Sequence, residues 1–572
     1  MSGATLRRGP VMLLVAGLWA LGPGCTPTYY KRDADREVYG ILRSPRAQAL
    51  GTPSGFRIDP SEQTALEALL AEQGEGADAP QPSERAMADL DPAKVPGGLP
   101  RGEGALRLSL RDALALAAEH SRDYQTAKET LYQAALALTL ERFKWTPQWS
   151  AGGSVTGTDE KTLNDVRGEN TLEGSSSLSV SQLLALGGEV SVNLATDLMR
   201  LTNAEPTKSA ASVLTIEVLQ PLWRNAGRLV ARETLTQAER DTLYAVRDFA
   251  RFRKSFCVDI TSSYYRVLQQ RDAVMNQWSN WQRIHISRIQ TEGLEKNGLV
   301  AGFQVDQARQ DELSARASWI RALQEYQQQL DQFKIALALP TEAAIELDPG
   351  EIERLREAGL GDPGLDRQEA VRAALSRRLD LLTAFDRVGD AERKVVLARN
   401  GLGPDVDLRL AASVPSRKEL KPLKLPFHRG VYSAALDFDL PLQRKEERNA
   451  YRQALINLHS AGRAAQEFRD QVALSVRQDW RDLQEAAESY RIQRDSVELA
   501  QRRVRSTSLL LQRGEAVPRD LLEANAALVA AQNALTRTLI DHTLSRLALW
   551  RDTEVLQVDE NGIWQEFQNG QE

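Results

Sequence analysis

The sequence contains very few of the residues on which most enzymes and metal proteins depend. Among 572 residues there are two cysteines and five histidines, and no histidine lies in a spacing typical of metal binding or catalysis. The sequence contains no phosphate-binding loop, no GxSxG motif and no paired cysteines. Cys257 lies within a helical pattern, which favours a buried structural thiol. We therefore expect no enzyme activity, no catalytic residue, no metal and no cofactor.

The chain also lacks a large excess of charge of either sign. Its 72 Lys and Arg residues face 78 Asp and Glu residues, which gives a net charge of −6. The two signs are interspersed along the predicted helices, and a solvent-exposed helix face accounts for most of these charges. This balance argues against nucleic acid as a partner.

The N-terminus has the pattern of an export signal. Arg7 and Arg8 precede a short apolar run at 11–22, which is too short to cross a bilayer as a mature helix. The small residues that follow end in Cys25 and resemble the lipobox of bacterial lipoproteins. We predict a signal peptide at 1–24 and a lipid anchor, with palmitate, on Cys25. The alternative is an ordinary secretory signal followed by an incidental cysteine.

The rest of the sequence reads as a tandem repeat of helix, strands, long helix, turn and long helix. The helix predicted to begin after Ser109 has a counterpart in the second repeat, which is predicted to begin at Asp366. A helix predicted from about Gly227 to Asn297 is nearly free of Gly and Pro, and its length is typical of a coiled coil. The predicted segments are a lipid-anchored arm and flexible linker at 25–104, a first repeat at 105–340, a connecting segment at 341–364, a second repeat at 365–550 and a C-terminal tail at 551–572.

Strands with two chemically different faces separate the helices of each repeat. In the segment 405–414 apolar residues alternate with Asp or Arg, and 431–440 shows the same alternation. Segments of about ten residues with this pattern suit both a transmembrane β-barrel and a half-exposed sheet on a soluble core. The export signal favours the barrel. The first repeat contains about twice as much strand sequence, with a tight turn at Gly187 and Gly188, so we predict an extra hairpin there.

Taken together, these features resemble the TolC family of outer-membrane efflux proteins over about 108–549. The resemblance depends on the tandem repeat, on the segment 220–227 ("QPLWRNAG") and on two related motifs, "GLVAGFQVDQA" and "GEAVPRDLLEA". It implies a mainly α fold with a membrane β-barrel part. In that fold, a tandem-repeat protomer joins a trimeric α-barrel that crosses the periplasm, with one shared β-barrel in the outer membrane. The implied function is that of the channel component of a tripartite efflux or type I secretion system, a passive export duct.

The resemblance also implies binding partners and the cellular location of each contact. A homotrimer would contact outer-membrane lipid, a periplasmic membrane-fusion adaptor and an inner-membrane transporter. The two motifs would form helix-to-helix turns that bind the adaptor, because glycine tolerates positive φ. The residues expected at these turns are Gly298, Leu299, Val300, Gly514 and Pro518.

Two acidic residues follow the second turn at the positions where the family narrows its pore. Asp520 and Glu523 would form stacked carboxylate rings in a trimer and constrict the channel for cations. The alternative is that Asp520 is an ordinary first-turn acid favoured by the helix dipole. The matching positions of the first repeat carry Gln304 and Gln307, so one acidic set per protomer is expected.

A function from another class fits part of the same sequence. A lipid-anchored coiled-coil protein could act as a structural or adhesive spacer with a small sheet domain. Such a spacer would not need two sets of alternating strands, so the strands favour the export duct. The long arm and the extra hairpin depart from the simplest family pattern, and the hairpin could enlarge either the extracellular region or the barrel.

Overall fold

The computed structural model describes residues 27–44, 56–58, 99, 106–160, 169–201, 208–416, 424–440, 442–513, 515–559 and 563–565. The predicted signal peptide, Cys25, most of the predicted arm and Gly514 lie outside these residues. The chain divides into two compact units, and each unit takes segments from both repeats. Unit 1 comprises 1–49, 131–246 and 383–466, and unit 2 comprises 50–130, 247–382 and 467–572.

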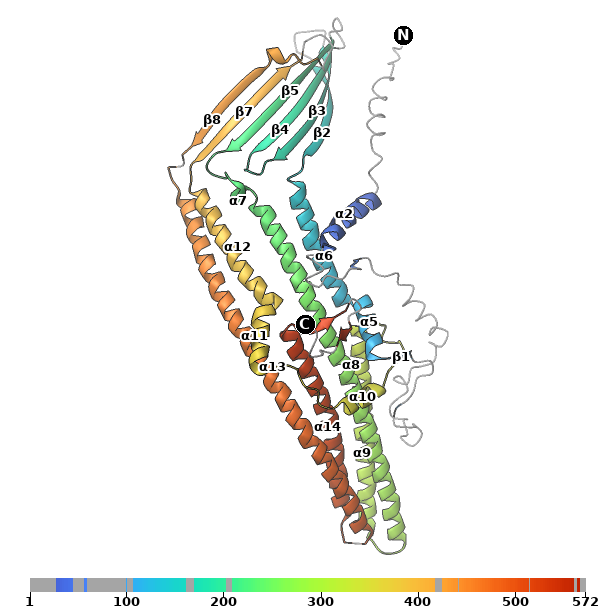
Figure 1. Ribbon diagram of the computed structural model, residues 1–572. Helices are drawn as coiled ribbons and strands as arrows, with labels where there is room; N and C mark the ends of the chain where they lie inside the picture. Colours follow the sequence, from blue (N-terminus) through green and yellow to red (C-terminus); the bar gives the residue numbers. More distant parts are fainter. Residues whose placement is uncertain are drawn as a thin grey trace, which may run out of the picture. The chain divides into compact units, whose positions relative to one another are not determined.

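Unit 1 contains a six-stranded sheet in the order β2-β3-β4-β5-β7-β8 (Figure 1). Every neighbouring pair of strands is antiparallel. The first repeat supplies the first four strands and the second repeat supplies two. The strands are β2 (Gln148–Glu160), β3 (Glu169–Leu183), β4 (Glu189–Leu201), β5 (Lys208–Pro221), β7 (Asp405–Pro415) and β8 (Val431–Asp439).

The register gives this sheet one apolar and one polar face, because directly opposed residues of an antiparallel pair lie on the same face. One row runs across all six strands and is almost entirely apolar: Trp149, Val180, Val192, Ile216, Ala412 and Tyr432. The neighbouring row on the opposite face is polar over its first five strands: Ser150, Ser179, Asn193, Thr215 and Ser413. The alternation predicted for the two strands of the second repeat is confirmed.

The predicted hairpin at Gly187 and Gly188 is confirmed as the turn between β3 and β4. Gly187 has a φ of 94°, and a Cβ there would lie 2.6 Å from the backbone oxygen of Asn225. By the order of the elements, β2 and β5 correspond to β7 and β8, so β3 and β4 form the extra hairpin. Both strands lie within the sheet, between β2 and β5.

A helix that the sequence did not predict lies in the segment expected to be an arm and linker. It is α2 (Pro27–Leu42), and its side chains Val38 and Leu42 are fully buried. Tyr132 donates a hydrogen bond to Asp35 at 2.7 Å and its ring lies edge-on to that of Tyr39. The i, i+4 spacing of the two buried residues is a local signal for this helix, and proline suits its first position.

The long helices follow the order predicted for two repeats. The helix predicted to run to Asn297 is observed as α8, and the long helix predicted after the turn of the first repeat is observed as α9. The helices α6, α8, α12 and α13 contribute residues to both units. The larger helices are α5 (Leu110–His120), α6 (Arg122–Phe143), α8 (Glu233–Lys296), α9 (Gly302–Ala336), α11 (Arg367–Arg377), α12 (Leu379–Gly401), α13 (Lys445–Gln512) and α14 (Pro518–Asp552).

Short elements complete the two units. In unit 1, α7 and the 3₁₀ helix η4 adjoin the sheet strands in sequence. In unit 2, β1 pairs in parallel with β6, and β9 pairs with β10 in antiparallel orientation. These elements are α7 (Arg228–Ala231), η4 (Phe427–Arg429), α10 (Gly350–Ala358), β1 (Leu106–Leu108), β6 (Ile345–Leu347), β9 (Gln557–Val558) and β10 (Trp564–Gln565).

The first helix of each repeat is broken where the sequence predicted a continuous one. Ser109 is an N-cap as predicted and accepts a hydrogen bond from the Asp112 amide at 3.2 Å. The helix then breaks at Ser121, where ψ is 133°. The second repeat breaks at Arg378, where ψ is 117°. Neither break contains Gly or Pro. In each repeat the new helix has an acidic residue in its first turn, which its dipole favours.

The core of unit 2 is formed by helices from both repeats. One cluster joins α11, α13 and α14 through Ala374, Val476 and Leu549. A second cluster packs Trp564 and Leu556 near the end of α14. Cys257 is 1% exposed, and burial raises the pKa of its thiol to about 12. The predicted buried structural thiol is therefore confirmed.

No helix in the described part of the chain is both long enough and apolar enough to cross a bilayer.

Candidate functional site: helical turns and a buried ion network

The first predicted turn ends α8 with a glycine in the left-handed region. Gly298 has a φ of 71°. Its amide donates to the carbonyl of Glu295 at 2.8 Å, and the amide of Leu299 donates to that of Leu294 at 3.0 Å. These two bonds form a Schellman motif, which satisfies carbonyls at the end of the helix. Leu299 is 70% exposed.

The second turn has one of these two hydrogen bonds among its described residues. The amide of Glu515 donates to the carbonyl of Leu510 at 2.9 Å, which is the longer bond of the same motif. The intervening Gly514 lies outside the described residues. The next helices begin at Gly302 and Pro518. Proline suits that first position because its missing N–H has no intrahelical partner there.

The two acidic residues after the second turn are exposed and make local contacts. The Asp520 carboxylate accepts a hydrogen bond from the Val517 amide at 3.1 Å and thereby caps α14. Glu523 pairs with Arg519 at 3.2 Å on the same helix. The contacts of Asp520 are those of the first-turn acid considered as the alternative. They leave both carboxylates accessible to solvent, so the constriction role remains a prediction.

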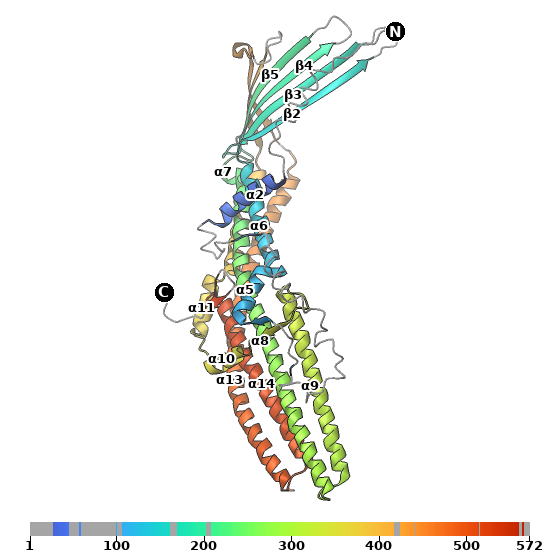
Figure 2. The same cartoon turned by 90° about the vertical axis from the view of Figure 1, so that its right-hand side faces the viewer.

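The two hairpins of unit 2, α8–α9 and α13–α14, end side by side at their turns (Figures 1 and 2). Close to the turns, Leu522 of α14 packs against a cluster of Trp281, Ile284 and Ala315. Arg283 of α8 donates a hydrogen bond to Asn525 of α14 at 2.9 Å. The acidic residues are thus placed by a helix that is held against the first hairpin.

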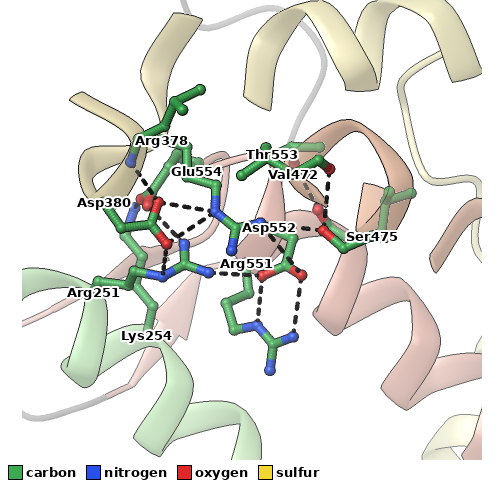
Figure 3. A network of polar contacts seen from close by, with 12 residues as sticks. Arg251, Lys254, Arg378, Asp380, Val472, Ser475, Arg551, Asp552, Thr553 and Glu554 are labelled. Carbon is green, nitrogen blue, oxygen red and sulfur yellow. Dashed lines mark hydrogen bonds and ion pairs between the residues drawn. The ribbon is translucent and has the colours of Figure 1, made fainter. Parts of the chain in front are cut away.

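A second polar site lies where α14 ends, and Figure 3 shows its contacts. Arg251 of α8 contacts three carboxylates: Asp380 at 3.0 Å, Asp552 at 3.2 Å and Glu554 at 3.3 Å. All four side chains are at most 22% exposed. Arg378, at the break between α11 and α12, lies 2.9 Å from Asp380. The network therefore joins α8, the α11–α12 break and the end of α14.

Asp479 of α13 faces the same network. Burial, and then the neighbouring Asp552 carboxylate, raise the pKa of Asp479 to about 7. Its Oδ2 atom is buried without a hydrogen-bond donor. The pKa of Asp552 moves in the opposite direction: burial would raise it, but Arg551, Arg378 and Arg251 together lower it. A proton on Asp479 thus allows two carboxylates to lie together.

No local sequence pattern marks this network. Its members come from three segments that are far apart in the chain, and each stands among other charged residues. Such charges are usually solvent-exposed, which was the interpretation made from the sequence. Among the described residues no group of three or more His, Cys, Asp or Glu side chains could hold a metal ion.

Gly298 offers a direct test of the first turn. Gly298→Ala should lower the free energy of unfolding by about 1 kcal/mol, because an L-residue is strained at positive φ. Gly293→Ala is the matched control. Gly293 lies in α8 with open space around a Cβ, so alanine there should stabilise the helix by about 0.5–1 kcal/mol. The midpoint of helix loss in urea would measure both, and shifts of the same sign would contradict the turn geometry.

Residues 370–550 match the sequence profile of the outer membrane efflux protein family. A search of curated protein sequences found no match. Several solved structures have a similar fold. The OprN outer-membrane channel is 15% identical with a TM-score of 0.55, and the match covers 78% of this chain and 89% of that one.

Two further channels give similar values. The CmeC outer membrane channel of Campylobacter jejuni is 14% identical with a TM-score of 0.56, over 78% of this chain and 85% of that one. The MtrE outer membrane channel of Neisseria gonorrhoeae, solved in its open state, is 15% identical with a TM-score of 0.53, over 78% and 88% of the two chains. At these identities the likeness shows a shared fold.

Proposed function

We propose that this chain, which carries an outer membrane efflux protein domain at 370–550, acts as an efflux channel in the outer membrane. Three copies form a passive duct that is closed at the helical turns. The observation that carries the proposal is the six-stranded sheet with one apolar and one polar face. A wall between lipid and a watery lumen needs that division.

The helical turns are the proposed adaptor-binding surface. Gly298 allows a sharp reversal, and Leu299 is largely exposed beside it. Val300 is the third residue proposed for this surface at the first turn, and Gly514 and Pro518 are the residues proposed for it at the second. A periplasmic adaptor that presents a helical hairpin would fit these small turns. An inner-membrane transporter supplies the energy, because the duct itself has no energy-coupling motif in its sequence.

Lipidation of Cys25 is part of the same proposal. The helix α2 begins at Pro27, two residues after the cysteine. Its burial against unit 1 through Val38 and Leu42 would hold the anchored segment beside the duct. Acylation then adds a second attachment to the outer membrane.

The proposed constriction is formed by Asp520 and Glu523 from three copies. Neutralising both with Asp520→Asn and Glu523→Gln should abolish most of the cation preference of the channel, because carboxylate rings concentrate cations. Asparagine retains an oxygen that can accept from the Val517 amide, so the cap of α14 is preserved. The measurement is conductance and ion selectivity in planar bilayers.

The matched control is Gln304→Ala with Gln307→Ala at the corresponding positions of the first repeat, which should leave the cation preference unchanged. If the Asp520→Asn, Glu523→Gln variant forms channels with the same ion selectivity as wild type, the duct is retained and the constriction role of these two residues is rejected. A folded, trimeric protein that forms no channels would reject the duct in favour of a lipid-anchored spacer.

A further inference from the structure

The β3–β4 hairpin has no counterpart in the second repeat, and the structure shows where it lies. It occupies the centre of the first-repeat part of the sheet, between β2 and β5. It pairs over nearly its full length with both neighbours: Gln148–Glu160 of β2 opposes β3, and Lys208–Leu219 of β5 opposes β4. A hairpin that projected from the sheet would leave β2 free to pair with β5 instead.

The two added strands have the same two faces as the rest of the sheet. On the apolar face, Leu178 and Leu194 lie in one row with Leu214 of β5. On the polar face, Ser179 and Asn193 lie in one row with Thr215. Leu178 is 46% exposed, so a single copy of the chain leaves much of this apolar side chain uncovered.

The turn of the hairpin is held at the strand-to-helix junction of the same repeat. The Leu186 carbonyl accepts a hydrogen bond from the Gly227 amide at 3.1 Å. Gly187 approaches the backbone of Asn225 so closely that a side chain would not fit. The hairpin is therefore fixed at its base as well as along both edges.

We infer that the β3–β4 hairpin is part of the lipid-facing wall of the channel, so that each copy contributes six strands to it. This inference rests on the proposed function. Six alternating strands leave β2 and β8, at the two edges, running in opposite directions. Copies can then join β8 to β2 head to tail and keep every seam antiparallel.

The number of strands sets the width of the wall. Three copies with six strands each would give an eighteen-stranded barrel about 36 Å across, at a strand spacing of ~4.8 Å and a tilt of ~40°. Four strands from each copy would give only about 24 Å by the same relation. A barrel of the larger size holds an open aqueous channel. Size selection of hydrophilic cargo would then occur at the helical turns and not in the membrane.

Single-cysteine labelling in liposomes tests which face of the hairpin meets lipid. In a Cys257→Ala background, in which the proposed acylation occupies the Cys25 thiol, Leu178→Cys and Val192→Cys carry a fluorophore on the apolar face, and Ser179→Cys and Asn193→Cys carry it on the polar face. The first two should be quenched by spin-labelled lipid and the last two by aqueous iodide.

The controls are Leu410→Cys and Ala411→Cys, on opposite faces of β7. Lipid quenching at Leu410 without quenching at Leu178 and Val192 would overturn the inference and leave the proposed function intact. Absence of lipid quenching at Leu410 as well would reject the proposed function itself.

Disulfide crosslinking tests whether the hairpin strand β3 pairs with β2. Ser150 and Ser179 are opposed, with their Oγ atoms 2.6 Å apart, so cysteines there should crosslink under oxidation. Ser150 and Thr215 are three strand spacings apart, about 14 Å, which a disulfide cannot bridge. Crosslinking of the second pair without the first would show that β2 pairs with β5 and that the hairpin lies outside the wall.

Discussion

Arg251→Met is expected to lower the free energy of unfolding by about 3 kcal/mol, because it leaves buried carboxylates without their shared cation. Arg251 contacts Asp380, Asp552 and Glu554, and these three side chains are 22%, 8% and 5% exposed. Lys254 still contacts Glu554, and Arg378 still contacts Asp380. The expected loss of stability is therefore at the lower end of the range for a broken buried ion pair.

The control for this substitution is Arg502→Met. Arg502 pairs with Glu498 on α13 at 3.0 Å, and both side chains are more than 60% exposed. An exposed pair of this kind contributes less than about 1 kcal/mol. Urea unfolding of the detergent-solubilised protein at fixed concentration, followed by circular dichroism, gives both values. Equal and small shifts would mean that the network is not buried in solution.

Asp479→Asn is expected to stabilise the protein at pH 8 and to have little effect near pH 4. The pKa of Asp479 is raised in the folded protein, to about 7. The charged Asp479 carboxylate therefore makes an unfavourable contribution to the stability of the folded protein. This contribution is absent below the pKa of the unfolded state, near 4, and it grows as the pH rises to 7. Above pH 7 the wild-type carboxylate is charged beside Asp552. Asparagine remains neutral and can donate a hydrogen bond to that neighbour.

The expected gain at pH 8 is about 1–2 kcal/mol, after allowance for partial solvent screening of Asp479. Other charges that act on Asp479 are Arg551 and Asp482. Asp495→Asn is the matched control, because Asp495 lies on the same helix and is 69% exposed. Unfolding midpoints measured from pH 4 to pH 8 test the prediction. A difference between wild type and Asp479→Asn that is constant over this range would contradict the raised pKa.

Local sequence patterns predicted the long helices, the strands and the order in which they follow one another. The near-absence of Gly and Pro over a long segment predicted α8. Alternation predicted β7 and β8, because a period of two follows directly from strand geometry. Glycine chemistry placed the turn at Gly298, where few other residues accept positive φ. The duplicated order of elements and the family resemblance were visible for the same reason, since they depend on the spacing of neighbouring residues.

Only the tertiary structure decided which distant residues meet. The helix breaks at Ser121 and Arg378 contain no glycine or proline, so no local rule marked them. The Arg251 network assembles charges from three distant segments of the chain, and each charge looks solvent-exposed in its own segment. The position of the β3–β4 hairpin could not be predicted from the sequence either. An alternating strand has the same residue pattern whether it pairs within a sheet or projects from it. Strand pairing, a non-local property, placed the hairpin between β2 and β5.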